Sequence, residues 1–99
     1  MVWKRWPERA LVRAYLIEEG VDVEAYDEIP ERISCSPDAI LIEGLKVEEG
    51  ERLLEMCGAK TGLIVLPRGV KMGCPSNLKA LYRPLSPKAI LEALKNLFD

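Results

Sequence analysis

Two short apolar runs constrain the fold of this chain more than any other feature of its sequence. Residues 39–42 read A-I-L-I and residues 62–66 read G-L-I-V-L, with no charged or polar side chain in either run. A strand without a polar face is typical of a parallel sheet that helices cover on both sides. The two runs therefore predict an α/β domain whose sheet lies between layers of helices.

Three other segments space their apolar residues as a helix does, and each has a proline or glycine at an end that suits it. The long helices predicted in this way cover residues 8–19, 47–57 and 87–97. Pro30 limits any helix within residues 28–34 to about one or two turns, and Gly69 and Gly73 favour an irregular crossover over residues 68–78. We therefore expect the second and fourth helices of the domain to be shortened.

Three more segments predict strands. They are residues 1–3, the alternating V-D-V-E-A at 21–25, and residues 78–82. With the two apolar runs they make a five-stranded parallel sheet, in which the alternation of 21–25 is typical of an edge strand. Right-handed crossovers then favour a three-layer, flavodoxin-like arrangement with strand order 2-1-3-4-5. A chain of 99 residues is enough for one domain, which spans residues 1–99.

Composition excludes several classes of function. The chain has no histidine, which rules out a histidine general base and any Ser–His or Cys–His nucleophilic pair. Its three cysteines, Cys35, Cys57 and Cys74, form no C-x-x-C pair and are too few for a structural zinc site. We expect no bound metal, no cofactor, no enzymatic activity, and thiols that are reduced and mostly buried.

Charge and hydropathy limit the partners and the location of the chain. Its 14 basic and 16 acidic residues leave a net charge of -2, which gives no electrostatic case for binding nucleic acid. No apolar run approaches the roughly 20 residues of a membrane span. We expect a cytoplasmic protein that does not bind membranes. Glutamine is absent while Glu, Lys and Arg are abundant, a bias typical of thermophilic proteins.

Three stretches share their order and motifs with one known family. Residues 7–26 run from a helix through a glycine into the alternating segment. Residues 37–43 read P-D-A-I-L-I-E, and residues 81–87 read L-Y-R-P-L-S-P. The last two resemble the P-D-x-x-[LI]-x-D strand and the K-P-F-x-P turn of response-regulator receiver domains, the CheY-like family. Because the three stretches span nearly the whole chain, the resemblance implies a receiver-like fold.

The resemblance also implies where the phosphotransfer site would lie, and every position there differs. Glu43 stands where receivers carry the phosphoacceptor Asp, and Lys4 and Arg5 occupy the positions of their acidic, Mg²⁺-binding pair. Pro67 replaces a Ser or Thr, and Arg83 replaces a Lys. Two cations at the metal position would repel Mg²⁺, which needs oxygen ligands. Without the metal, nothing neutralises a phosphoryl group in transfer, so we expect no phosphotransfer.

Three interpretations of this degenerate pocket stay open. Glu43 pairs with Lys4, Arg5 or Arg83 across the carboxyl ends of the strands and so locks the pocket. Alternatively these charges are partly solvated and contribute only on the order of 0–1 kcal/mol each. In the third interpretation Glu43 is a permanent mimic of a phosphorylated state.

The function we expect is that of a non-catalytic, receiver-like signalling or interaction module, which contacts a protein partner or a second copy of itself. Receivers commonly pair through a face built from the fourth helix, the fifth strand and the last helix. The corresponding residues here are Leu81, Tyr82, Ile90, Leu94 and Phe98.

The alternative function is binding of a small anion, a nucleotide or a nucleic acid in the pocket at the carboxyl ends of the strands. Arg68, Gly69 and Lys71 form a candidate ligand loop after the second apolar run. This loop lacks the G-x-x-x-x-G-K-[ST] and G-x-G-x-x-G motifs, so a simple connector is the other interpretation. The W-K-R-W segment at 3–6 suits either base stacking or a buried Trp3 with solvated cations.

Overall fold

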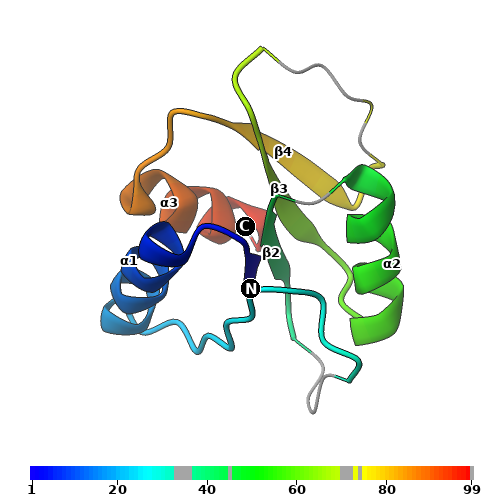
Figure 1. The fold of residues 1–99 in the computed structure, drawn as a ribbon, viewed down its shortest axis with the longest axis horizontal. Helices are drawn as coiled ribbons and strands as arrows, with labels where there is room; N and C mark the ends of the chain where they lie inside the picture. The colour runs from blue at the N-terminus through cyan, green and yellow to red at the C-terminus, as the bar shows by residue number, and fades with distance from the viewer. Residues whose placement is uncertain (33–36, 45, 70–72, 74, 99) are drawn as a thin grey trace.

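A four-stranded parallel sheet organises the part of the chain that the computed structural model describes, residues 1–32, 37–44, 46–69, 73 and 75–98. The elements follow in the order β1 (Val2–Trp3), α1 (Trp6–Glu18), β2 (Ile40–Glu43), α2 (Val47–Cys57), β3 (Gly62–Leu66), β4 (Leu78–Tyr82) and α3 (Pro87–Leu97) (Figure 1). The chain is therefore an α/β domain, as its two apolar runs predict.

The two apolar runs form the centre of the sheet. The strand order is β1-β2-β3-β4, and every neighbouring pair is parallel. All residues of β2 and β3 are buried, which confirms that both faces of these strands are covered.

Local signals set the ends of the helices. The hydroxyl of Ser86 accepts a hydrogen bond from the amide of Ala89 at 3.2 Å and so caps α3. Gly58 ends α2 with a φ of 69°, a left-handed conformation that glycine adopts without strain. Both helices accordingly begin and end at the residues that the sequence predicts.

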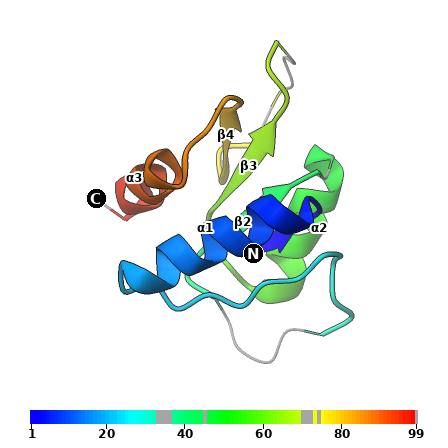
Figure 2. The same ribbon diagram turned by 60° about the vertical axis from the view of Figure 1, so that its left-hand side comes forward.

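Helices cover both faces of the sheet and divide the core into two clusters. On one face α2 packs over apolar side chains that include Ile42 and Ile64. On the other face α1 and α3 lie side by side over Trp3, Leu63 and Val65 (Figures 1 and 2). The domain thus has three layers and is compatible with a flavodoxin-like fold. Because the strands are parallel, their carboxyl ends meet at one edge of the sheet.

The predicted strand at residues 21–25 does not form, so the prediction of five strands in the order 2-1-3-4-5 is wrong. The described residues form four strands, and residues 21–25 are irregular. An isolated parallel bridge between Tyr26 and Val2 joins this segment to β1. Val21 and Val23 instead pack against the core cluster beneath α1 and α3. The alternation of these valines with acidic residues therefore reflects burial of every second side chain. An extended loop buries its side chains in this way without hydrogen bonds to a neighbouring strand.

The short second helix is also not formed in the described part of its predicted range. Residues 28–32 are not helical, and residues 33 and 34 lie outside the described residues. Pro30 lacks an amide donor, which disfavours a helix that would be short in any case. After β3, Arg68 and Gly69 form a turn, and no described residue between 67 and 77 is helical.

The three helices are short. Helix α1 has 13 residues, and α2 and α3 have 11 each. None of these helices of the described part has the length and apolar character that crossing a bilayer requires.

The close contact between β2 and β3 gives a first prediction. A Cβ added at Gly62 would clash with Cγ1 of Ile40 and lie 2.9 Å from its carbonyl oxygen. Because the backbone of a paired central strand cannot move away, we expect Gly62→Ala to lower the free energy of unfolding by about 2–3 kcal/mol. Urea denaturation measures this. Gly73→Ala, where an added Cβ has no neighbour within 4 Å, is the control and should stay within about 0.5 kcal/mol of the wild type.

Candidate functional site

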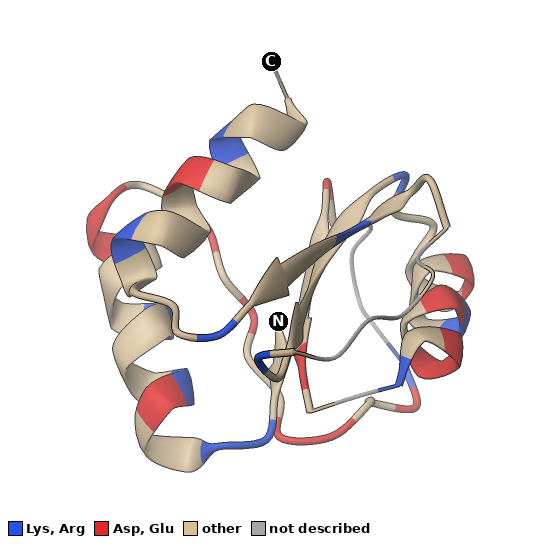
Figure 3. Ribbon diagram, turned by 90° about the horizontal axis from the view of Figure 1, so that it is seen from above, with Lys and Arg blue, Asp and Glu red and all other residues tan. Residues whose placement is uncertain are grey.

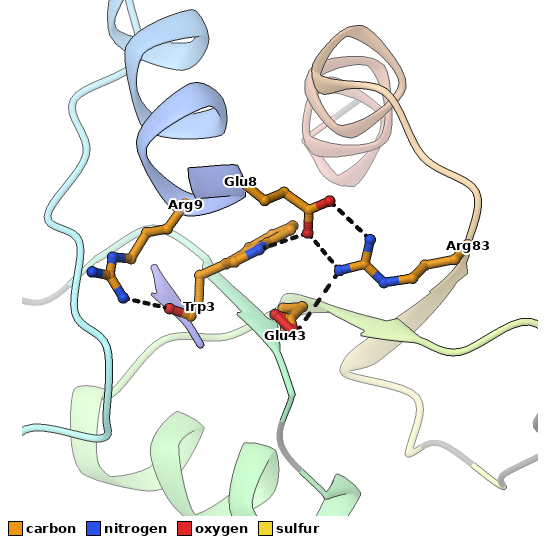
Figure 4. A network of polar contacts seen from close by, with 5 residues as sticks. All are labelled: Trp3, Glu8, Arg9, Glu43 and Arg83. Atoms are coloured by element: carbon orange, nitrogen blue, oxygen red, sulfur yellow. Dashed lines mark hydrogen bonds and ion pairs between the residues drawn. The ribbon is translucent and has the colours of Figure 1, made fainter. Parts of the chain in front are cut away.

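The carboxyl ends of the strands bring together residues from distant parts of the sequence. Trp3 ends β1, Glu43 ends β2, and Arg83 directly follows β4. The amide of Arg83 donates a hydrogen bond to the carbonyl of Leu66 at 3.1 Å, which holds the start of the Arg83 side chain beside the end of β3. From there the guanidinium extends toward the first turn of α1 (Figure 4).

Glu8, in the first turn of α1, is the main partner of Arg83. Nη1 of Arg83 donates to Oε2 of Glu8 at 2.9 Å, and Nη2 donates to Oε1 at 2.5 Å. The indole of Trp3 also donates to Oε1 of Glu8, at 2.9 Å (Figure 4). Both carboxylate oxygens therefore accept hydrogen bonds, in the bidentate geometry that makes Arg–carboxylate pairs strong.

Glu43 lies on the other side of the same guanidinium. Its Oε1 is 3.9 Å from Nη2 of Arg83, an ion pair beyond hydrogen-bond distance. The side chain is only 9% exposed, and its Oε2 is buried without a hydrogen-bond partner among the described residues. Arg83 is thus shared by two carboxylates, bound tightly by Glu8 and more loosely by Glu43. We call Glu8, Glu43 and Arg83 the strand-end cluster.

Trp3 and Arg9 fix the position of α1 above this cluster. Trp3 is almost fully buried, and its carbonyl accepts a hydrogen bond from Nη1 of Arg9 at 2.9 Å (Figure 4). Glu8 and Arg9, neighbours in α1, therefore both bind to Trp3, one through its indole and one through its backbone. This confirms the interpretation of Trp3 as a core residue.

Arg83 and Glu8 each stabilise the charged form of the other. Hydrogen bonds from Arg83 hold the pKa of Glu8 below its ordinary value, the Trp3 indole adds to this, and partial burial acts against it. The same hydrogen bonds raise the pKa of Arg83. Glu8, Glu43 and Arg83 thus form a network of charged side chains that joins α1 to the strand ends.

The other predicted members of the pocket form no ion pair with this cluster among the described residues. Lys4, Arg5 and Pro67 are exposed, so of the three cations considered for Glu43, Arg83 is the one that forms an ion pair with it among the described residues. The stem of Lys4 lies on Gly44, because a Cβ added there would be 3.1 Å from Cγ and Cδ of Lys4. Sequence reasoning missed Glu8 as a member of this site. A glutamate in the first turn of a helix is already explained by the helix dipole, without a partner elsewhere in the fold.

The remaining candidate residues do not form one surface. Arg68 and Gly69 are exposed in the turn after β3, and Lys71 lies outside the described residues. Of the five candidate interface residues, Ile90 is buried in the core and Leu81 and Leu94 are half-buried. Tyr82 and Phe98 are exposed, at 44% and 59%.

No group of three or more Cys, His, Asp or Glu side chains in the described part of the chain is placed to hold a metal ion. Cys57 is buried, and burial raises the pKa of its thiol, which lowers its reactivity at neutral pH. It borders a cavity of about 550 Å³ near the amino ends of the strands, remote from the strand-end cluster.

Comparison of the chain with protein-family models, with curated proteins and with solved structures finds no match. The interpretation of the strand-end cluster therefore depends on its own geometry and chemistry.

The lowered pKa of Glu8 predicts how stability depends on pH. Folding lowers the pKa of the Glu8 carboxyl from its ordinary value of 4.5, so the contribution of its ion pair to stability is complete above pH 4.5. That contribution is lost as the pH falls through the folded pKa. We expect Glu8→Gln to lower the free energy of unfolding by about 1 kcal/mol at pH 7 and to weaken the loss of stability in acid. Urea titrations between pH 7 and 3 measure both, and Glu51→Gln, an exposed glutamate of α2, is the control.

Glu43 gives the opposite prediction. Glu43→Met removes a buried carboxylate with an unpartnered oxygen, while Arg83 keeps both hydrogen bonds to Glu8. We expect this variant to be as stable as the wild type or more stable, since a buried charge recovers its desolvation cost only with good partners. Arg83→Met leaves Glu8 unpaired and should cost about 2 kcal/mol in the same urea assay. Equal destabilisation by the two variants would contradict this division of roles.

Proposed function

We propose that this chain is a non-catalytic, receiver-like interaction module that acts through protein–protein contacts and does not depend on phosphorylation. The observation that carries the proposal is the placement of Arg83, whose guanidinium binds Glu8 through two hydrogen bonds and forms an ion pair with Glu43. A cation built into the protein thus occupies the space between two carboxylates at the strand ends.

The chemistry of this cluster supports a module without phosphotransfer. Mg²⁺ in such sites is held by carboxylate oxygens that are free to coordinate it. Here both oxygens of Glu8 already accept hydrogen bonds, and Glu43 is buried beside Arg83. Exposed Lys4 and Arg5 add positive charge after β1. A metal would have to displace Arg83 from Glu8 before it could bind.

The topology supports the receiver-like part of the proposal. Glu43 ends a central strand, and Arg83 precedes Pro84 after the edge strand β4, at the places that the sequence motifs indicate. Tyr26 bridges the outer edge of β1, which is what a receiver-like chain would retain if its second strand were lost. In this proposal the ion pairs replace the switch of a receiver, so the module stays in one state.

The alternative, a site for a small anion, nucleotide or nucleic acid at the strand ends, has less support. Arg83 is bound to carboxylates, so exposed cations such as Lys4, Arg5 and Arg68 would have to hold the ligand. Thermal-shift measurements with phosphate, nucleotides and short oligonucleotides separate the two functions, and a clear rise in Tm with any of them would favour the alternative.

Incubation with acetyl phosphate and Mg²⁺, followed by intact-protein mass spectrometry, tests the preferred function. We expect no phosphorylated species for the wild type or for Glu43→Asp, because restoring the acceptor type does not restore a metal site. An active receiver domain in the same tube is the positive control. Phosphorylation of the wild type that Glu43→Gln abolishes would overturn the proposal.

A further inference from the structure

The side of α1 that faces away from the sheet is largely apolar, with exposed Arg13 and Glu18 among its apolar residues. The apolar residues are Trp6, Pro7, Ala10, Leu11, Ala14 and Ile17, and all are exposed. Trp6 and Leu11 are 68% and 67% exposed, and Ile17 is 43% exposed. We call these six residues the outer face of α1. A helix that is apolar on the outside as well as on the inside is normally buried on both sides.

The two polar residues in the first turn of α1 face the inside of the domain. Glu8 and Arg9 point inward and bind Arg83 and Trp3. The outward sides of the other helices carry charge instead, for example Glu51 and Arg52 of α2. Figure 3 shows α2 banded in red and blue, and longer tan stretches between the charged residues of α1. Of the six exposed large hydrophobic side chains among the described residues, three lie on α1 (Trp6, Leu11 and Ile17), and the other three are spread over α2, β4 and the end of α3 (Met56, Tyr82 and Phe98).

The spacing along the outer face matches that of a coiled-coil seam. Pro7, Ala10, Ala14 and Ile17 recur at alternating intervals of three and four residues, as the a and d positions of a heptad do. Ala10 and Ala14, small residues at the middle of this row, allow a second helix to approach closely. Because the folded domain already holds α1 as a helix, pairing with a second helix does not carry the cost of forming α1.

The charges beside this row indicate what the second helix is. Arg13 directly precedes Ala14 and Glu18 directly follows Ile17, which are the g and e positions that carry salt bridges between paired helices. Both are exposed, and neither forms an ion pair within the described residues. In a parallel pair of identical helices, a g residue lies opposite the e residue of the partner five positions later. Arg13 of each copy would then meet Glu18 of the other.

We propose that two copies of this chain form a parallel, two-fold symmetric dimer through the outer face of α1. This names the partner of the interaction module proposed above and rests on that proposal. An antiparallel pair is disfavoured because it would bring Arg13 against Arg13 of the second copy. A single helix face is a small interface, so the dimer should form with a dissociation constant in the micromolar range or weaker.

Sedimentation equilibrium over a wide concentration range tests the dimer. We expect the wild type to dimerise, and Ala14→Glu to raise the dissociation constant at least about tenfold, because it places two like charges in the seam. Ala14 is exposed, so this change does not disturb the core. Met56→Glu on α2, also at an exposed apolar residue, is the matched control and should dimerise as the wild type does.

Charge exchange tests the pairing of Arg13 with Glu18. Arg13→Glu alone and Glu18→Arg alone should each weaken the dimer, since each creates a like-charge pair across the seam. The double variant restores opposite charges and should recover most of the affinity. Weakening in both single variants without recovery in the double variant would contradict the pairing.

Cysteine cross-linking tests the parallel direction. Ile17→Cys places a thiol near its own copy in a parallel pair, within the distance that a disulfide requires, and far from it in an antiparallel pair. We expect a disulfide-linked dimer on mild oxidation that the wild type, with its natural cysteines, does not form.

Two results would contradict the proposed dimer. In one, the wild type stays monomeric at the highest concentration, and in the other, the Ala14→Glu variant dimerises as the wild type does. A monomer that binds anionic vesicles through the same face would assign that face to lipid. None of these results bears on phosphorylation, so failure of the dimer and failure of the proposed function are told apart by the acetyl phosphate assay.

Discussion

Glu8 and Arg83 lie 75 residues apart in the sequence, yet their bidentate pair joins the first turn of α1 to the end of β4. β1 and β4 are the two edges of the sheet, so the pair ties one edge to the other across the carboxyl ends of the central strands. It also sets the position of Trp3, whose indole shares the carboxylate of Glu8. The orientation of α1, and with it both of its faces, follows from this contact.

The same contact decides what the strand ends can do. A buried carboxylate such as Glu43 is costly unless a cation lies nearby, and Arg83 provides that cation while still bound to Glu8. Both carboxylates thus share one guanidinium. A site of this kind favours rigidity over exchange of ligands, which is why the function we propose for the chain is one of contact and not of chemistry.

Helix α1 shows how one constraint leads to another. The polar side chains of its first turn face the inside of the domain, where Glu8 binds Arg83 and Arg9 donates a hydrogen bond to the carbonyl of Trp3. The outside is left to alanines, Leu11, Ile17 and an exposed Trp6. Helix α1 thus links the strand-end cluster to the surface on which we propose that a second copy binds.

Local signals in the sequence by themselves determined the α/β class, the two buried central strands, and the bounds of α2, α3, β3 and β4. Apolar runs, the Ser86 cap and Gly58 act through neighbouring residues, so they can be interpreted without the fold. Which segments pair as strands, and which side chains become partners, depends on residues that are far apart in the sequence. Residues 21–25 alternate as a strand would, yet they pack as a loop, because alternation reports burial and not the presence of a neighbouring strand. Only the tertiary structure brought Glu8 to Arg83, since no short-range pattern joins residues at opposite ends of a chain.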